Sequence, residues 1–476
     1  KEGGLKNPCY FCGTEITRIS ANHIIFMDNT PAAVDGKLTG KKIGLIAYPI
    51  LISLLMEHLI GLTDTAFLGR VGEVELGASA IAGVYYLALF MLSFGFSIGT
   101  QILIARRNGE KRYPEIGRLF QQGIFFMLLM AGIMFFFSQT WSSSILRPLI
   151  SSDQVFKATD SYINWRVYGF FFSFTALMFR ALYVGITKTK ILTLNSLVMV
   201  LTNVVLNYLL IFGKLGMPRL GIAGAAIGSS VAELVSVVFF LIYTLRKIDW
   251  RKYGLFRNMG FDLRVLWHML GVSIWTMLQA FISIVTWFLF FIAIEHLGER
   301  PLAITNIVRS LSSFIFMIIT AFAATGSSLV SNLMGEGRTE EVLPVCRKII
   351  RMCYTLVLPL LAVMAIFPGL FLRIYTDSAP LIAASIPALW VMLSVYLINV
   401  PGIVWFNAVS GTGNTRSALG MEILCIVAYM LYVFYVVIYL KADVAVCWTT
   451  EHVYGIVMLW LSWHYMQRGK WKHKKI

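Results

Sequence analysis

Long apolar runs recur down the whole chain, and short polar segments separate them. A run of about 20 apolar residues is long enough to cross the hydrocarbon core of a bilayer as a helix. The pattern therefore predicts an all-α polytopic membrane protein with twelve transmembrane helices. We place the spans at residues 43–68, 76–104, 117–137, 162–184, 191–212, 220–245, 265–294, 302–330, 349–372, 382–409, 419–440 and 444–466.

The composition excludes most classes of soluble protein. Apolar residues make up 58% of the chain and charged residues 13%, whereas soluble domains average about 45–50% and about 25%. The formal net charge of +16 does not indicate a nucleic-acid partner, because the basic residues lie in short loops, where membrane topology and anionic headgroups account for them. The six cysteines are scattered and predict no disulfide framework.

Alternate loops differ in their content of basic residues. One set holds groups such as Arg106 with Arg107 and Lys111 with Arg112, whereas the opposite set holds single residues such as Lys214. The bias is roughly three to one, and Lys and Arg accumulate on the cytoplasmic side of membrane proteins. Both termini are therefore expected in the cytoplasm.

The segment 1–40 is polar and differs from the rest of the chain. We expect a disordered cytoplasmic tail, since terminal segments that pack on nothing remain unordered. Cys9 and Cys12 form a CxxC pair, with His23 beyond them. A zinc site is the alternative, but no fourth ligand stands at the right spacing, so no metal is predicted.

The chain contains an internal repeat. Three short patterns recur after 226 positions without a gap: Gly72-Glu73 with Leu76, Gly109-Glu110 with Arg112, and Gly185 with Thr189-Lys190, in which Arg416 takes the place of Lys190 in the second copy. Each repeat holds six spans, so both halves have the same orientation and are related by a pseudo-two-fold axis along the membrane normal. We therefore predict an N-lobe at 41–245, a cytoplasmic linker at 246–264, a C-lobe at 265–467, a basic tail at 468–476 and a cavity between the lobes.

The first predicted span carries two acids, Glu57 and Asp64. Seven positions place them on nearly the same helical face, roughly 10 Å apart. A charge deep in a bilayer costs about 2.5 kcal/mol or more, so each needs a partner, water or a cation. Asp64 either binds H⁺ or Na⁺ or lies wet at the outer interface. Glu57 either shares in the coupling or forms a structural ion pair with Arg180 or Arg309.

Further polar residues lie inside other spans. Asn203 and Asn207 are four apart on one helical face, where their oxygens suit Na⁺ or a protonated Asp64. The alternative is interhelical bonding, worth about 0.6 kcal/mol for each hydrogen bond. Glu233 is central in its span and is a third coupling candidate, whereas Glu422 lies near a span end, within reach of the surface.

Aromatic and methionine side chains are abundant, and most of them pack or face lipid. A few that face the cavity would suit a cationic or amphipathic substrate through apolar and cation–π contacts. The candidates for this lining are Tyr85, Met91, Trp275, Met277, Phe281 and Asn399.

No enzyme signature is found in the sequence. It has no Walker loop, no dinucleotide fingerprint after a strand, no HExxH and no nucleophile elbow. We therefore expect no catalytic residues and no cofactor apart from a coupling ion, H⁺ or Na⁺.

Several motifs together resemble the MATE family of multidrug and toxic compound extrusion transporters. They are the LTDT context of Asp64, GRVGEVELGASAIA from Gly69, the Asn203/Asn207 pair, GMPRLGIAGAA from Gly216 and the Gly411-x-Gly413-Asn414-Thr415 pattern. The resemblance covers about residues 41–466. It implies twelve helices in two six-helix lobes, cation-driven efflux by alternating access, and a bacterial cytoplasmic (inner) membrane protein that acts as a monomer.

The same resemblance implies that Asp64 is the cation or proton site. One branch of the family carries acids in the seventh and tenth spans, but here those regions show Ser283 and Asn399. The acids Glu57, Asp64 and Glu233 are thus concentrated in the first half of the chain.

The leading hypothesis is a secondary antiporter that exports cationic or amphipathic small molecules in exchange for H⁺ or Na⁺. One alternative is a flippase for lipid-linked precursors, which would favour a strongly basic cavity. The other is a membrane receptor or scaffold without transport, which would need no buried acids.

Overall fold

The computed structural model describes residues 36, 38–257 and 260–474 of the chain. The predictions for Cys9, Cys12 and His23, and for most of the tail 1–40, lie outside these residues. The described part is built from helices. Eleven of its helical segments are long and apolar enough to cross a membrane, and one bent pair makes a twelfth. The predicted all-α polytopic fold with twelve transmembrane helices is confirmed.

The helices follow the predicted order, and most of them run a few residues beyond the predicted ends. The first half contains α1 (Gly40–Gly69), α2 (Glu73–Gly109), α3 (Tyr113–Leu146), α4 (Asp153–Arg166), α5 (Gly169–Gly185), α6 (Lys190–Phe212) and α7 (Ile222–Lys247). The second half contains α8 (Leu263–Glu295), α9 (Glu299–Gly335), α10 (Val342–Ile366), α11 (Pro368–Leu372), α12 (Ala379–Gly411), α13 (Thr415–Val433), α14 (Val444–Cys447) and α15 (Thr450–Gln467).

Short elements complete three of these spans and one chain end. They are the 3₁₀ turns η1 (Arg147–Leu149) and η2 (Thr339–Glu341), the π-helix η3 (Phe434–Tyr439) and the 3₁₀ turn η4 (Lys470–His473). Side-chain caps fix three of the described starts: Thr39 accepts the backbone N–H of Lys42, Ser152 accepts that of Val155, and Asp262 accepts those of Arg264 and Val265.

The fourth span differs from its predicted course. Hydropathy placed it at 162–184 as one helix, but the structure begins it at Asp153 and breaks it into α4 and α5. The two pieces are bent by 51° at Val167–Tyr168. The bend leaves the last residue of α4, Arg166, inside the lobe, where it contacts Glu233.

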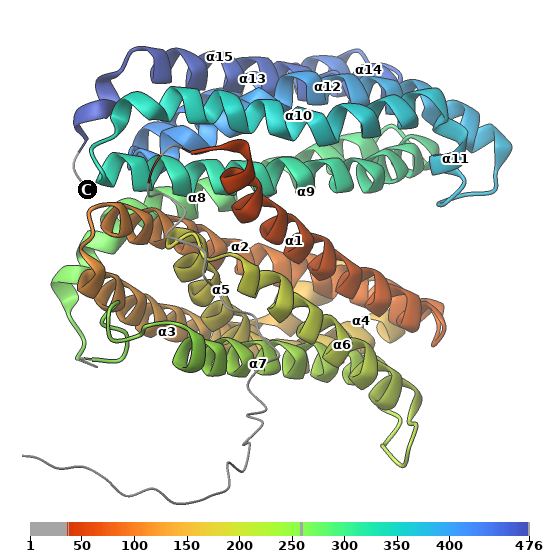
Figure 1. Ribbon diagram of the computed structural model, residues 1–476. Coiled ribbons are helices and arrows are strands. Elements are labelled where there is room, and N and C mark those ends of the chain that lie inside the picture. Colours follow the sequence, from red (N-terminus) through yellow and green to blue (C-terminus); the bar gives the residue numbers. More distant parts are fainter. Residues whose placement is uncertain (1–35, 37, 258–259, 475–476) are drawn as a thin grey trace, which may run out of the picture.

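The helices form two lobes that lie one above the other in Figure 1, α1–α7 below and α8–α15 above. The repeat is visible in matching hydrogen bonds. Thr189 donates to the carbonyl of Ile46 at 2.9 Å, and Thr415 donates to that of Val272 at the same 2.9 Å. Both members of the second pair stand 226 positions after those of the first. The two halves therefore share one fold, as the predicted pseudo-two-fold axis requires.

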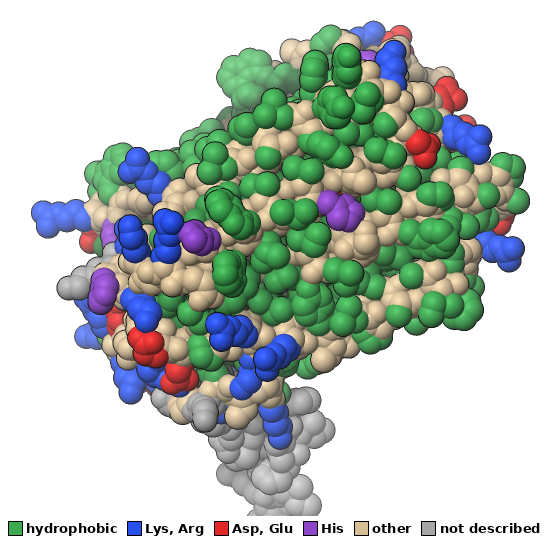
Figure 2. Space-filling view, turned by 90° about the horizontal axis from the view of Figure 1, so that it is seen from above, with side chains coloured by type: hydrophobic (Ala, Val, Ile, Leu, Met, Phe, Trp, Pro, Cys, Tyr) green, Lys and Arg blue, Asp and Glu red, His purple; other side chains and the backbone are tan. Residues whose placement is uncertain are grey.

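The lobes meet most closely at one end of the molecule, which we call the basic end. Gly36 before α1 and Lys474 after α15 both lie there, beside the α2–α3 and α9–α10 turns. Figure 2 shows apolar side chains over the middle of one face, with Lys and Arg gathered toward its ends. This distribution fits a protein whose middle is surrounded by lipid.

Two glycines bring the lobes together at the basic end. A Cβ at Gly109 of α2 would lie 2.0 Å from the carbonyl oxygen of Asn332, and one at Gly335 of α9 would lie 2.3 Å from that of Arg106. The two contacts are equivalent in the repeat, because Gly335 stands 226 positions after Gly109 and Asn332 stands 226 positions after Arg106. Only glycine permits helices to approach this closely.

Hydrogen bonds across the interface reinforce this approach. Ser328 and Ser331 of α9 donate to the carbonyls of Val184 (2.6 Å) and Ile102 (2.7 Å), and Asn332 donates to that of Gly185 at 3.0 Å. In the described residues, ring contacts continue this interface along α1 and α9 as far as His58 and Phe314, whose centroids are 5.1 Å apart.

The terminal segments cross between the lobes at the same end. Arg106 of α2 donates to the carbonyls of Thr412 (3.3 Å) and Lys474 (2.9 Å) in the second half. In the opposite direction, Arg338 and Lys348 of the second half donate to the carbonyls of Gly36 and Leu38, each at 2.9 Å. The described segments before α1 and after α15 are thus each hydrogen-bonded to the other lobe.

Substitution of Gly109 tests the close contact of the lobes. We expect Gly109→Ala to lower the free energy of unfolding by about 1–3 kcal/mol, because the added methyl group overlaps a backbone oxygen of the partner helix. The matched control is Gly132→Ala on α3, where a Cβ meets nothing within 4 Å. Thermal unfolding of the purified variants measures the difference, and equal stability of the two would contradict the packing described.

Candidate functional site

Asp64 lies on α1 where this helix meets α6 and α7, and its carboxylate faces into the first lobe. Asn207 Nδ2 donates to Oδ1 at 2.5 Å, and Ser229 Oγ donates to Oδ2 at 3.1 Å. Asn207 is fully buried and Ser229 is 6% exposed. The half-buried carboxylate is therefore held between helices by neutral donors.

The donors are themselves joined in a closed ring. Asn207 Nδ2 also donates to Asn203 Oδ1 at 3.1 Å, and Asn203 Nδ2 donates to Ser229 Oγ at 3.0 Å. Gly228 leaves room for the ring, since a Cβ there would lie 2.5 Å from Asn207 Oδ1. The structure thus brings together three of the predicted coupling residues, Asp64, Asn203 and Asn207, and adds Ser229.

The ring is rich in oxygen atoms and has no basic member. Among the described ion pairs, none includes Asp64, and the buried Asn207 Oδ1 has no hydrogen-bond partner among the described residues. A buried polar atom without a partner is costly and marks a place where a further group can bind. The described residues hold no cluster of three or more His, Cys, Asp or Glu for a metal ion.

Glu233 lies one turn beyond Ser229 on α7 and has a different partner. Arg166 contacts both of its carboxylate oxygens, at 2.9 and 2.6 Å, and the guanidinium also lies 4.0 Å from the centroid of the Tyr86 ring. Gly169 makes this possible, because a Cβ there would lie 2.2 Å from Arg166 Nη1 and 2.5 Å from Glu233 Oε2. The predicted coupling candidate is thus one half of a bidentate ion pair.

Glu57 lies two turns from Asp64 along α1, nearer the basic end. Its carboxylate accepts from Ser53 at 3.1 Å and from Arg180 at 3.4 Å, and the side chain is 39% exposed. Of the two arginines that the sequence offered as partners, Arg180 is the one in contact. Arg309 lies instead over the rings of Trp287 and Phe291, 5.6 Å from each centroid.

The predicted lining residues are spread over both lobes. Tyr85 donates to Ser138 at 2.9 Å inside the first lobe, and Met91 is half-buried on α2. Met277 is buried where the backbone of α8 meets Gly95 of α2, so it lies at the interface of the lobes. Phe281, one turn further along α8, is 39% exposed.

Two of the predicted lining residues contact their own lobe. The indole of Trp275 donates to the carbonyl of Gly271 at 3.0 Å and lies beside Arg416 of α13, 5.5 Å from its guanidinium. A Cβ at Gly455 of α15 would lie 2.3 Å from Oδ1 of Asn399. Asn399 therefore packs between α12 and α15, and the structure does not bring it together with the other candidates.

The prediction for the position of Glu422 is wrong. The side chain was expected within reach of the surface, but it is 1% exposed on α13 and accepts from Ser283 at 2.6 Å and from Tyr454 at 2.8 Å. Glu451 on α15, which the sequence analysis did not single out, accepts from Tyr429 at 3.1 Å. Acidic groups are therefore not confined to the first half of the chain.

Sequence reasoning also missed two neighbours of the first-lobe acids. Ser229 carried a signal, because it stands four residues before Glu233 and so on the same helical face. Arg166 carried a stronger one, because it lies within the predicted span 162–184, where an arginine requires a partner.

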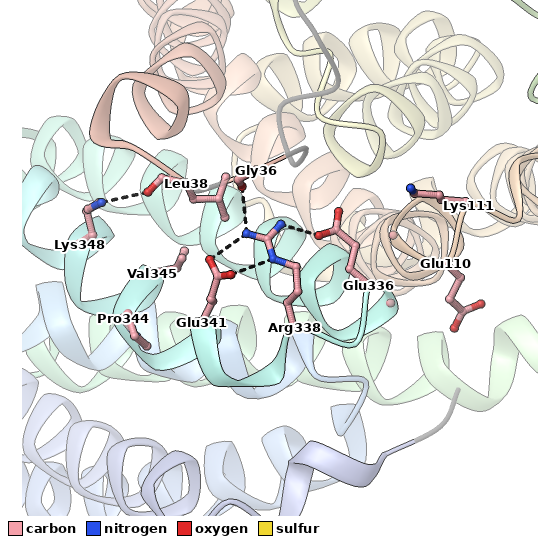
Figure 3. A pocket seen from close by; sticks show the side chains of 12 residues that line it. Gly36, Leu38, Glu110, Lys111, Glu336, Arg338, Glu341, Pro344, Val345 and Lys348 are labelled. Carbon is pink, nitrogen blue, oxygen red and sulfur yellow. Dashed lines mark hydrogen bonds and ion pairs between the residues drawn. The ribbon is translucent and has the colours of Figure 1, made fainter.

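A pocket of about 980 Å³ opens at the basic end, roughly 36 Å along α1 from Asp64. Figure 3 shows Arg338 between Glu336, Glu341 and the carbonyl of Gly36, with Lys348 bound to the carbonyl of Leu38. Its charged groups are engaged with one another across the turn between α9 and α10. This pocket belongs to the closed contact between the lobes and not to the Asp64 ring.

Removal of Arg166 tests the buried ion pair. We expect Arg166→Gln to lower the free energy of unfolding by about 3–5 kcal/mol, because Glu233 is left charged and unpaired inside the lobe. The double variant Arg166→Gln/Glu233→Gln should recover most of the loss. The matched control is Arg147→Gln, whose exposed pair with Asp153 is worth at most about 1 kcal/mol.

Thermal or denaturant unfolding of the purified variants gives these differences. A single variant as stable as the double variant would show that Glu233 does not depend on Arg166.

The architecture and the site can be compared with known proteins. The family description MatE matches residues 49–209 and 271–435, one segment in each lobe and together more than half of the chain. The chain belongs to the MatE family. It is therefore a polytopic membrane transporter for small molecules and not an enzyme.

Curated relatives agree with this assignment. The chain is 23% identical over 394 residues to a protein named "Probable multidrug resistance protein NorM" from Pasteurella multocida (strain Pm70), covering 82% of this chain and 84% of that protein. It is 25% identical over 313 residues to "Multidrug resistance protein MdtK" from Yersinia pestis (strain Pestoides F), covering 62% of this chain and 65% of that protein.

Solved MATE structures share the fold. One, described as the outward-facing conformation of a multidrug resistance MATE family transporter, gives a TM-score of 0.84 at 18% identity, covering 93% of this chain and 98% of that chain. The eukaryotic MATE transporter AtDTX14 gives a TM-score of 0.80 at 18% identity, covering 91% and 96%. At this identity the likeness concerns the arrangement of the helices in the MatE-family chain.

Proposed function

We propose that this MatE-family chain is a secondary antiporter that exports cationic or amphipathic small molecules in exchange for H⁺ or Na⁺. The observation that carries the proposal is the Asp64 ring, an acid between helices that is held by neutral donors alone. The multidrug resistance names of its relatives support the substrate class. Each chain contains both lobes, so we propose that a single copy carries out transport.

Binding of a cation would change the charge of the ring and hence the packing around it. An ionised carboxylate without a bound cation costs free energy in this surrounding, and binding of H⁺ or Na⁺ removes that cost by neutralising the charge. A ligand that prefers one arrangement of the helices shifts the population toward that arrangement. The ring therefore supplies the differential binding that coupled transport by alternating access requires.

The helix that carries Asp64 also contacts the other lobe. α1 packs against α6 in its own lobe and against α9 in the second, through Tyr48 against Phe322 and His58 against Phe314. Pro49 lies between these contacts and removes a backbone hydrogen bond, so the helix bends there at low cost. We propose that movement of α1 transmits the state of Asp64 to the interface between the lobes.

The access path is inferred from where the lobes touch. They are closed at the basic end, and we propose that this end faces the cytoplasm of a bacterial inner membrane, as the distribution of Lys and Arg favours. The conformation is then outward-facing. Along that path we propose Tyr85, Met91, Met277 and Phe281 as substrate contacts, since rings and thioether groups suit amphipathic cations.

Substitution of Asp64 tests the proposed function. We expect Asp64→Asn to abolish export of a cationic dye from proteoliposomes, because the amide cannot gain or lose a charge. The matched control is Asp153→Asn at the start of α4, whose side chain is 71% exposed and should leave export unchanged. Separate H⁺ and Na⁺ gradients identify the ion. Undiminished gradient-driven export by Asp64→Asn would refute the role of this residue.

Orientation is tested by labelling in whole cells. We expect a membrane-impermeant maleimide to reach a cysteine placed at Lys214, in the α6–α7 loop, but not one placed at Lys111, in the α2–α3 turn. The unsubstituted chain gives the background from its own cysteines, and permeabilised cells give full labelling. Labelling at Lys111 alone would place the basic end outside.

A further inference from the structure

The second lobe contains two carboxyl groups that the Asp64 ring does not explain. Glu422 projects from α13 and Glu451 from α15, into the space that these helices share with α8. Ser283 of α8 and Tyr454 of α15 both donate to the same oxygen of Glu422, Oε1. The other oxygen, Oε2, is buried and has no hydrogen-bond partner among the described residues.

This arrangement is unfavourable for an ionised carboxylate. A charged group at 1% exposure needs an opposite charge or a full set of donors, and Glu422 has two hydroxyl donors on one side only. A neutral carboxyl group removes most of the cost, because the proton resides on the oxygen that lacks a donor. The open oxygen therefore points to a proton as the missing ligand.

Among the described residues, no basic side chain forms an ion pair with either acid. The elements packed against α13 and α15 carry few charged or histidine residues: Arg264, His268, Glu295, Arg416, His452, His464 and the basic residues of η4. Among the described ion pairs, neither acid is joined to any of them. Arg416 lies over Trp275, and His452 bonds Ser394 at 2.9 Å.

The titratable groups that do face the two acids are neutral at physiological pH. They are Tyr396, Cys425, Tyr429 and Tyr454. The site thus differs from the Glu233–Arg166 pair, where a fixed positive charge balances the carboxylate.

The internal repeat places an acid and a serine at equivalent positions of the two lobes. Ser283 and Glu422 stand 226 positions after Glu57 and Ser196. In the first lobe Ser53 bridges the latter two, donating to Glu57 at 3.1 Å and contacting Ser196 Oγ at 2.7 Å. The same two helices of each repeat therefore bring an acid and a serine together, but the acid lies on the first helix in one lobe and on the fifth in the other.

The repeat also includes Tyr429, the hydrogen-bond donor to the second acid, Glu451. Tyr429 stands 226 positions after Asn203 of the Asp64 ring. Its ring contacts that of Tyr454 edge to face, with centroids 6.0 Å apart. The two acids and the two tyrosines form one row between α13 and α15, in the order Glu422, Tyr454, Tyr429 and Glu451. Along α13, Glu422 and Tyr429 are seven positions, or roughly 10 Å, apart.

We propose that Glu422 and Glu451 form an exchangeable proton-binding site of the second lobe, distinct from Asp64. Glu422 takes up the proton on Oε2 while Ser283 and Tyr454 remain bound to Oε1. Loss of that proton leaves a charge among α8, α13 and α15 and changes the packing of these helices. The significance for transport rests on the proposed antiport, but proton binding itself does not.

Infrared difference spectroscopy of the purified full-length protein tests the site, because a protonated carboxyl group has a C=O stretching band that its carboxylate lacks. Spectra are taken between pH values without substrate or gradient. We expect Glu422→Gln and Glu451→Gln each to remove one pH-dependent band. The matched control is Glu295→Gln, whose side chain is 63% exposed and should leave both bands in place.

Two milder variants keep the test decisive if Glu422→Gln does not fold. Ser283→Ala and Tyr454→Phe each remove one donor to Oε1, so the Glu422 band should move to higher frequency without disappearing. The proposal would be overturned if none of these variants removed or moved a band in the difference spectra between pH values. Loss of the band on addition of Na⁺ at constant pH would also overturn it, since the site would then bind sodium.

The same measurement separates the two proposals. Asp64→Asn should stop export and leave the Glu422 and Glu451 bands unchanged. In the unsubstituted chain, bands without gradient-driven export would refute the antiport and retain the proton site, whereas export without these bands would refute the proton site and retain the antiport.

Discussion

A carboxylate inside a bilayer must be balanced, and this requirement governs the interior of both lobes. Charge in hydrocarbon is expensive, so each buried acid is met by a defined set of groups. Glu233 has a guanidinium in bidentate contact, whereas Asp64 has amide and hydroxyl donors. The first arrangement balances the charge with an opposite one, whereas the second offers only neutral donors, which is why we propose Asp64 and not Glu233 as the residue that responds to a cation.

The contact between the lobes follows from a different consequence of the same solvent. Helices in lipid gain nothing from burying apolar surface, so close packing and hydrogen bonds to backbone groups hold them together. The glycines at the basic end bring backbones into contact, and serine hydroxyls then reach carbonyls of the opposite lobe. At the basic end the contact therefore depends on small side chains and backbone carbonyls.

The sequence predicted the features that depend on hydropathy and periodicity. The twelve spans and the repeat follow from chain length in lipid and from spacing, and Asn203 with Asn207 follows from the four-residue period of one face. It did not predict the role of Arg166, because hydropathy does not detect the bend between α4 and α5 that places this residue inside the lobe. Glu422 was misplaced for a related reason, since distance from a predicted span end does not tell which neighbours cover a side chain.

The glycine contact has a consequence for how far the two halves of the chain can differ from each other. Gly109 meets the segment around Asn332, and Gly335 meets the equivalent segment around Arg106, so the surface is complementary to itself across the pseudo-axis. Self-complementary patches of this kind are the hallmark of isologous dimers. Two copies of one half would meet through this same surface, so the contact does not depend on the differences between the halves, such as the exchange of acid and serine at Glu57 and Ser283.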